Sequence, residues 1–213
     1  MTTKAFPTGT ICDAARDLSD HVRIKSQIPR GAWRIDAREP ILGPAYTIRV
    51  SRARHPSESP LEDFFAAVDG VPAGSFVVCQ VVGAVEGATI GDAITTRFAK
   101  QGAVGMVVDG DVRDYTGVLG AGIPTWVRGA QVEGMLVPRM KIEAQVDIQL
   151  GGVDVSPGDY VSGDSDGLFV IPADEVAAVL AAATAIDESE QHMFAMLREG
   201  ATIASVYHKT GRA

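Results

Sequence analysis

The apolar run from Ser75 to Val82, Ser-Phe-Val-Val-Cys-Gln-Val-Val, is the feature that most constrains how this chain can fold. It has the length of a β-strand and is too apolar to leave one face in water, so we expect it at the centre of a sheet. A helical pattern follows at Asp92 to Lys100, and a second buried strand follows at Val104 to Val108. Strands and helices that alternate in this way indicate an α/β layered domain.

The rest of the chain continues this alternation and then changes character. We predict, in chain order, a helix over Thr8 to Ser19, a strand over Ala45 to Val50, a helix over Leu61 to Val68 and a long helix over Asp174 to Arg198 that ends near Gly200. After Pro124 the segments are shorter, and turns at Gly151-Gly152 and Pro157-Gly158 favour antiparallel strands. No repeat, low-complexity tract or linker divides the sequence, so we expect a single domain over residues 1–213.

Composition excludes several classes of protein. With 213 residues, 46% of them hydrophobic, the chain can bury a proper core. A net charge of -8 argues against a surface for nucleic acid or anionic lipid, which would need clustered Lys and Arg. The first residues lack the apolar run of a signal peptide and no stretch is apolar enough to span a bilayer, so we expect a cytoplasmic protein. Cys12 and Cys79 lie far apart in the sequence, which predicts two buried thiols rather than a disulfide or a zinc site.

A glycine-rich turn leads into the helix expected at Asp92. Gly83, Gly87 and Gly91 recur at every fourth residue, which is neither the dinucleotide fingerprint nor a P-loop. The turn does leave backbone N–H groups free at the start of the helix, where the helix dipole favours a carboxylate or a phosphate. A plain strand-to-helix turn, with Asp92 as the partner of the dipole, explains the same residues, and the sequence leaves both readings open.

Arg113 and Asp114 follow the next buried strand and the turn signal Asp109-Gly110. Ligand sites in open α/β sheets collect at the carboxyl ends of strands. Arginine offers a planar fork to a carboxylate or an enolate oxygen, and aspartate oxygens suit hard divalent ions such as Mg²⁺. We therefore predict a metal site for an anionic substrate here, with a solvated surface ion pair as the alternative.

The terminal helical segment carries one apolar stripe with a carboxylate on it. The stripe is formed by Val176, Val179, Leu180, Ala183, Ile186, Met193, Phe194 and Leu197. Glu190 falls on the stripe, whereas Glu188 falls nearly opposite it. A carboxylate on a buried face is costly unless it is paired or near a metal, so Glu190 is a candidate for a site or an interface. The alternative is a bend near Asp187 that leaves Glu190 exposed.

The four histidines show no zinc-binding spacing, and no serine-hydrolase elbow is present.

Taken together, these motifs give the chain a family resemblance. The motifs are Thr10-Ile-Cys-Asp-Ala, Gly43-Pro-Ala-Tyr-Thr, the Gly87 to Asp92 turn, Val107-Val-Asp-Gly-Asp-Val-Arg-Asp, Gly151-Gly-Val-Asp-Val-Ser-Pro-Gly-Asp and Gly163-Asp-Ser-Asp-Gly-Leu-Phe-Val-Ile-Pro. The chain resembles the RraA-like family, which contains class II 4-hydroxy-4-methyl-2-oxoglutarate/4-carboxy-4-hydroxy-2-oxoadipate aldolases and the regulator of ribonuclease activity A. The resemblance implies a swivelling β/β/α fold like that of phosphohistidine domains. It also implies a homotrimer, sometimes paired into a hexamer, with active sites between subunits and residues 174–199 packed at a subunit interface.

The resemblance also implies residue roles. Asp114 would bind Mg²⁺ or Mn²⁺, largely through water, and Arg113 would contact the substrate. Asp92 would orient water, while Gly91 and the amides of Ala93 and Ile94 would hold the carboxylate of a pyruvyl group. A glutamate from the terminal helix of a neighbouring subunit would complete the metal site, and Glu190 fits it better than Glu188.

The implied chemistry is metal-dependent aldol cleavage of 4-hydroxy-2-oxo acids, in which a pyruvate enolate forms and is stabilised by the metal and Arg113. Oxaloacetate decarboxylation passes through the same enolate and is expected as a second activity. The motifs contain no lysine, which disfavours a Schiff-base aldolase, and no loop suits S-adenosylmethionine. Residues 52–60 and 126–133 depart from the family pattern, which leaves the rest of the substrate open. The alternative is a non-catalytic regulator that binds a ribonuclease.

Overall fold

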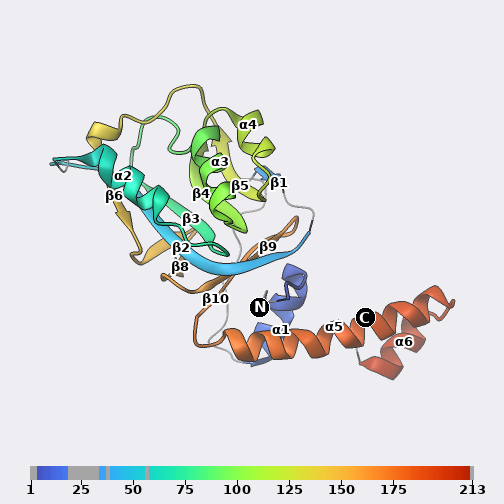
Figure 1. The fold of residues 1–213 in the computed structure, drawn as a ribbon. Helices are drawn as coiled ribbons and strands as arrows, with labels where there is room; N and C mark the ends of the chain where they lie inside the picture. Colours follow the sequence, from blue (N-terminus) through green and yellow to red (C-terminus); the bar gives the residue numbers. More distant parts are fainter. Residues whose placement is uncertain (1–3, 19–33, 37–38, 56–57, 212–213) are drawn as a thin grey trace.

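The strand expected at Ser75 to Val82 lies in the middle of the sheet in the computed structural model, which describes residues 4–18, 34–36, 39–55 and 58–211. Strand β3 (Phe76–Val82) pairs in parallel with β2 (Ile41–Arg52) on one side and with β4 (Gly105–Val112) on the other. Its side chains from Phe76 to Cys79 are fully buried, as the apolar run predicts. The sheet order is β1-β5-β4-β3-β2-β9-β10, with β6 paired to β2. The mixed α/β class expected from the sequence is confirmed (Figure 1).

Strand β2 connects the parallel strands of the sheet to the antiparallel strands β9 and β10. It is therefore twice as long as predicted. Residues 45–51 pair with β3, whereas residues 41–44 pair with β9 (Tyr160–Asp164). Strand β9 then forms an antiparallel hairpin with β10 (Gly167–Ile171). The first part of β2 escaped prediction because Gly43 and Pro44 interrupt its apolar pattern.

The expectation of antiparallel strands after Pro124 does not hold for the pairing of β5 (Thr125–Ala130) with β4, which is parallel, although β5 is antiparallel to its other neighbour. A short helix, α4 (Tyr115–Gly120), makes the crossover that a parallel pair needs, and its six residues are too few to show a periodic pattern. The later strands are antiparallel as expected: β6 (Met140–Ala144) pairs with β2, and β7 (Ile148–Leu150) pairs with β8 (Val153–Val155). At the far edge of the sheet, β1 (Arg34–Asp36) pairs with β5.

Helices cover the sheet in two groups (Figure 1). Helices α2 (Pro60–Asp69) and α3 (Asp92–Gln101) share a core with one face of β2, β3 and β4. Helices α1 (Thr8–Leu18) and α5 (Val176–Arg198) pack on each other and on the β9–β10 hairpin in a separate cluster.

Cys79 is buried in the first cluster and its burial raises the pKa of its thiol to about 12. Cys12 is only half-buried, because it lies at the margin of the second cluster.

The long terminal helix is confirmed, and it ends as the sequence predicts. Gly200 has φ 93°, its N–H donates to Leu197 O, and the N–H of Ala201 donates to Met196 O. This is a Schellman motif, which needs a left-handed residue just past the helix. A further helix that was not predicted, α6 (Ile203–Thr210), begins with Thr202 as its N-cap. Within the described part of the chain, no helix is long and apolar enough to cross a membrane.

An ion-pair network holds the edge strand β6 against β2. The Arg49 Nε and Glu143 Oε2 atoms are 3.0 Å apart, and Lys141 Nζ lies 2.7 Å from Glu143 Oε1. Hydrogen bonds from Arg49 and then Lys141 lower the pKa of Glu143 below its ordinary value of 4.5.

We expect Glu143→Gln to lower the free energy of unfolding by about 1 kcal/mol at pH 7, since the partly buried pair is lost. Because the folded-state pKa is depressed, this contribution is complete above pH 4.5 and disappears as the pH falls through the folded-state value. Urea unfolding of both proteins at pH 7 and at pH 3 measures the difference. An equal difference at both pH values would contradict the assignment to the ionised carboxylate.

Candidate functional site

The glycine-rich turn before α3 and the end of β4 lie side by side. The N–H of Thr89 donates to Asp111 O at 3.0 Å, and the N–H of Arg113 donates to Ile90 O at 3.0 Å. On its other side the turn meets the loop after β5, where Ala88 N–H donates to Glu133 O at 2.8 Å. Backbone bonds to both neighbours therefore fix the turn beside Arg113.

Three glycines leave room for the polar groups of this site. A Cβ atom at Gly91 would lie 3.1 Å from Arg113 Cγ and 3.4 Å from Asp114 Oδ2. A Cβ at Gly117, in the first turn of α4, would lie 2.8 Å from Asp92 Oδ2, and one at Gly134 would lie 3.0 Å from an Arg113 Nη1 atom. The structure thus brings Arg113, Asp114 and Asp92 together where α3 and α4 begin, with Asp92 as the first residue of α3 and Asp114 just before α4.

Gly87 shows how tightly the turn is held, because its φ is 91° and a Cβ there would lie 2.6 Å from the backbone of Gly134. We expect Gly87→Ala to lower the free energy of unfolding by about 2 kcal/mol or more, since an L-residue is strained at this φ and the neighbouring backbone must move. Gly83→Ala is a matched control, because Gly83 has φ 75° with nothing within 4 Å of its Cβ position. Denaturant unfolding compares the two, and equal losses would show that the contact with Gly134 has no effect.

Arg113 and Asp114 form an ion pair between neighbouring residues. Arg113 Nε lies 2.9 Å from Asp114 Oδ2, and the two side chains are 49% and 45% exposed. Asp114 occupies the left-handed region, with φ 53° and ψ 44°, and it precedes α4 without capping it. Aspartate and asparagine adopt that region more readily than other non-glycine residues, and such positions are common at functional sites. The rest of the Arg113 fork is directed at no other described acceptor, so it remains available to a ligand.

The start of α3 offers fewer free amides than the sequence suggests. The N–H of Ala93 already donates to Asp92 Oδ1 at 2.7 Å. The N–H of Ile94 has no acceptor among the described residues, and the N–H of Thr95 donates to Gly91 O. Ile94 is therefore the amide best placed for an anion, and Ala93 would have to release the Asp92 carboxylate to join it.

Glu190 and Glu188 lie away from this cluster. Helix α5 runs unbroken through residues 187–189, so the bend considered for Asp187 is absent. Glu190 is half-buried, and Thr10 Oγ1 lies 3.4 Å from its Oε2 atom across the contact between α1 and α5, whereas Glu188 is exposed. Figure 1 places α5 beyond the β9–β10 hairpin, on the other side of the molecule from α3 and α4.

The carboxylates of this cluster are of the donor type that suits a divalent ion. Among the described residues, no three His, Cys, Asp or Glu side chains are grouped closely enough to hold a metal. Asp92 and Asp114 do supply two hard oxygen ligands that reach solvent, and Mg²⁺ commonly binds through one or two carboxylates and keeps several waters. His55, His192 and His208 are exposed and lie outside the site, and His21 falls outside the described residues.

Sequence reasoning missed Gly117 and Gly134, which clear space for Asp92 and Arg113. Neither glycine belongs to a recognisable sequence motif. Each matters only because of the side chain that lies against it in the fold, Asp92 for Gly117 and Arg113 for Gly134. Residues 131–133, which depart from the family pattern, do lie beside the site, because Glu133 O accepts from the N–H of Ala88 and the N–H of Met135 donates to Ala88 O.

Comparison with known proteins places the chain in a family. The RraA-like family model, Aldolase/RraA, matches residues 8–170. A Halalkalibacterium halodurans protein named "Putative 4-hydroxy-4-methyl-2-oxoglutarate aldolase" is 29% identical over 169 residues, 79% of this chain and 74% of that protein. An Albidiferax ferrireducens protein of the same name is 28% identical over 79% of this chain and 96% of that protein. Protein DlpA of Legionella pneumophila is 28% identical over 76% of this chain, which corresponds to only 26% of DlpA.

Solved structures show the same fold. An uncharacterized protein from Pseudomonas syringae pv. tomato superposes with a TM-score of 0.77 at 25% identity, covering 95% of this chain and 89% of that one. Streptomyces coelicolor RraAS2, an unusual member of the RNase ES inhibitor RraA protein family, gives a TM-score of 0.72 at 25% identity, covering 91% and 93%. The fold, the order of the motifs and the family match agree, and the chain belongs to the Aldolase/RraA family.

Proposed function

We propose that this protein is a divalent-metal-dependent lyase that releases pyruvate from 4-hydroxy-2-oxo acids of the 4-hydroxy-4-methyl-2-oxoglutarate type and from oxaloacetate. The observation that carries the proposal is the convergence of Arg113, Asp114 and Asp92 in space left by glycines at the start of two helices. The aldolase names of two relatives support the same reaction class.

Each residue of the site has a role in this reaction. The N–H of Ile94 and the dipole of α3 hold the carboxylate of the 2-oxo acid. Asp92 orients the water that takes the proton from the C4 hydroxyl. The C3–C4 bond then breaks, C4 becomes a carbonyl, the bonding electrons move into the enolate, and return of the proton to C3 gives pyruvate. The Arg113 fork binds the oxygen on which that charge develops. A divalent ion such as Mg²⁺ or Mn²⁺, held by Asp114 and by Glu190 of a neighbouring subunit, would supply Lewis-acid polarisation of the 2-oxo group.

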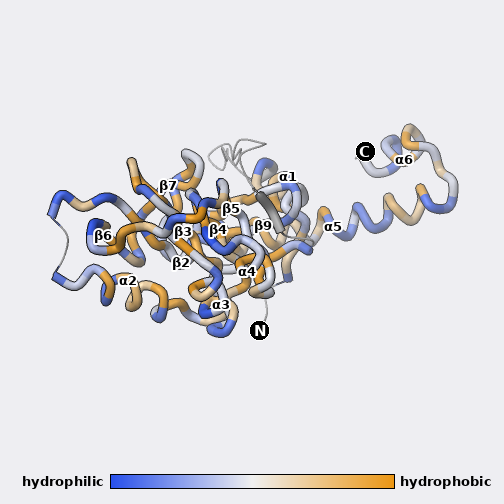
Figure 2. The backbone as a smooth tube through the Cα atoms, turned by 90° about the horizontal axis from the view of Figure 1, so that it is seen from above, coloured by the Kyte–Doolittle hydropathy of each residue, from blue (hydrophilic) through white to orange (hydrophobic). Residues whose placement is uncertain are grey.

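A second copy of the chain is needed to bring Glu190 to this site. The outer half of α5 and helix α6 extend away from the body of the molecule (Figure 2), and Phe194, Ile203 and Tyr207 on this arm are 42%, 58% and 52% exposed. Large apolar side chains on a projecting arm are suited to contact with another subunit. We therefore place residues 174–199 at a subunit interface in a homotrimer or hexamer, with the neighbouring subunit's site within reach of Glu190.

The direct test measures pyruvate release from oxaloacetate and from 4-hydroxy-4-methyl-2-oxoglutarate, with Mg²⁺ and after EDTA. Release from both substrates that stops on chelation supports the proposal. Release from oxaloacetate alone retains the enolate chemistry but contradicts this aldol substrate. Absence of release from either substrate would contradict the proposed lyase activity. Binding to a ribonuclease would then support the alternative, a non-catalytic regulator.

Mixing subunits tests the shared site. Glu190→Gln and Asp114→Asn proteins are expected to be inactive alone, and co-refolded mixtures should regain activity because some sites combine an intact Asp114 with an intact Glu190. Glu188→Gln is the matched control and should remain active alone, since Glu188 lies on the exposed face. Failure of the mixed oligomers to regain activity would contradict the placement between subunits.

A further inference from the structure

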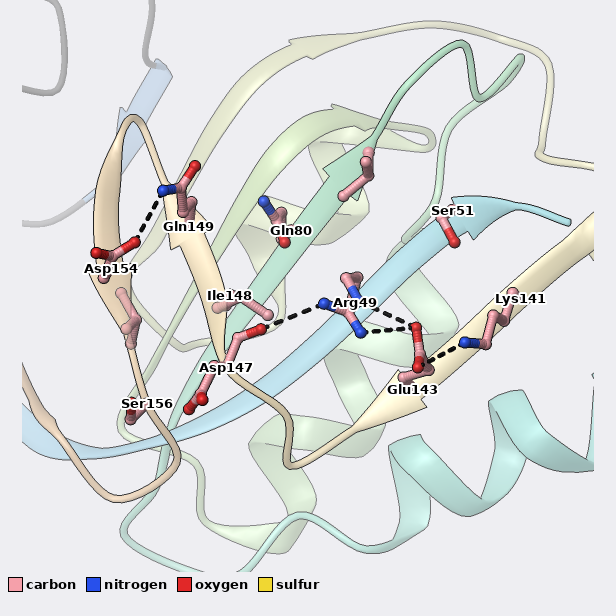
Figure 3. A pocket seen from close by; sticks show the side chains of 12 residues that line it. Arg49, Ser51, Gln80, Lys141, Glu143, Asp147, Ile148, Gln149, Asp154 and Ser156 are labelled. Carbon is pink, nitrogen blue, oxygen red and sulfur yellow. Dashed lines mark hydrogen bonds and ion pairs between the residues drawn. The ribbon is translucent and has the colours of Figure 1, made fainter.

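A polar hollow of about 690 Å³ lies on the face of the sheet away from α2 and α3 (Figure 3). Strands β2 and β3 form its floor, β6 forms one wall, and the β7–β8 hairpin forms the other. Arg49 and Gln80 face it, whereas the alternate residues Ile48 and Cys79 pack in the core beneath the helices. None of the residues that line the hollow belongs to the site around Arg113, so the hollow is a second, separate location.

The β6 side of the hollow carries two cations against one carboxylate, with Arg49 on the floor strand β2 and Lys141 on β6. Arg49 Nη2 and Nε each lie 3.0 Å from Glu143 Oε2, and Arg49 Nη1 lies 3.4 Å from the backbone oxygen of Asp147. Lys141 Nζ binds the other oxygen of Glu143 at 2.7 Å. Glu143 thus neutralises one of two cations, and the Lys141 ammonium, 60% exposed, keeps protons for a further acceptor.

The opposite wall carries two carboxylates. Asp154 Oδ1 accepts a hydrogen bond from Gln149 at 2.8 Å, which leaves its second oxygen available. The carboxylate of Asp147 has no hydrogen-bond or ion-pair partner among the described residues, although its backbone oxygen accepts from Arg49. The hairpin wall is therefore negative where the β6 wall is positive.

The floor between these walls has unpaired polar groups. Gln80 lies beside Arg49 in the register of β2 and β3, and its amide is half-buried. Neither this amide nor the hydroxyl of Ser51 bonds to any group in the described part of the chain. Partly buried polar groups cost free energy unless water or a ligand satisfies them.

We propose that this hollow binds a small zwitterion, with its ammonium group at Asp147, on the wall to which Asp154 adds negative charge, and its carboxylate at Lys141. A molecule with a single charge would satisfy one wall and leave the other unpaired. An apolar molecule would remove water from Gln80 and Ser51 without replacing their hydrogen bonds. The volume lies in the range of small-molecule sites, about 300–1,000 Å³.

Isothermal titration calorimetry of the full chain against glycine, 4-aminobutyrate and 6-aminohexanoate tests this inference. At least one of these zwitterions should bind saturably, and butyrate and butylamine should bind about tenfold more weakly. Asp147→Asn and Lys141→Met should each weaken the zwitterion about tenfold, because each removes one charged partner. The exposed residues Asp174 and Lys100 provide matched controls, as Asp174→Asn and Lys100→Met, which should bind as the wild type does.

Several results would overturn the proposal. Absence of binding by all three zwitterions would do so, as would equally tight binding of the singly charged compounds. Unchanged affinity in both Asp147→Asn and Lys141→Met would show that the walls do not recognise the ligand. Since neither residue belongs to the Arg113 site, pyruvate release by these two variants should be that of the wild type, which keeps this test independent of the proposed lyase.

Discussion

Asp114→Asn is expected to lower metal-dependent pyruvate release by about 10²-fold or more while the protein stays folded. The reason is the loss of one of two carboxylates at the site, since removing a group that only orients a metal ligand already costs about 10–100-fold. Asparagine tolerates the left-handed backbone of this position, at φ 53°, so the substitution removes charge without adding strain. Initial rates with oxaloacetate across a Mg²⁺ titration measure the effect.

Two further variants make the result specific. Asp114→Ala should lose the same activity with a lower stability, because alanine is less tolerant of this backbone conformation. Asp174→Asn changes the same chemistry on an exposed residue remote from the site and should retain full activity. A wild-type rate for Asp114→Asn at saturating Mg²⁺ would rule out this residue as a metal ligand.

Arg113→Lys is expected to lower kcat by about 10²-fold to 10³-fold, the usual loss when one donor to a developing oxyanion is removed. Lysine keeps the positive charge but cannot present the planar fork of parallel N–H donors with which Arg113 pairs to Asp114 through Nε and faces the substrate through its terminal nitrogens. Mn²⁺ affinity, measured by calorimetry, should change much less than kcat, since Arg113 is no metal ligand. A near-native kcat would show that Arg113 serves only to hold Asp114 in place.

Chemical rescue provides a second measurement of the same role. Guanidinium added to an Arg113→Ala protein should restore part of the lost rate, because the space left by the side chain lies beside Gly91 and Gly134. Rescue by guanidinium but not by ammonium would support planar, two-point binding.

The central sheet was predictable because its signal is local. The apolar run of β3 and the periodic pattern of α3 and α5 each exceed the length at which a strand or helix can be recognised. Helices α4 and α6 are short, and the first part of β2 contains Gly43 and Pro44, so these elements depend on contacts that a local pattern does not record.

The proximity of Arg113, Asp114 and Asp92 was predictable because they stand in Gly- and Asp-rich turns that follow buried strands, whereas their role as a site stays a prediction. The sequence by itself determined the α/β class, the central strand, the long terminal helix and this choice of charged residues. Only the tertiary structure decided that Gly91 and Gly117 stand against these carboxylates, that Ala93 is already bonded to Asp92, and that Glu190 lies away from them. The hollow beside Arg49 also arises only in the fold. The physical reason is range: hydrophobic periodicity and turn chemistry act between neighbours in the chain, whereas a site is made by residues that the fold brings together from distant segments.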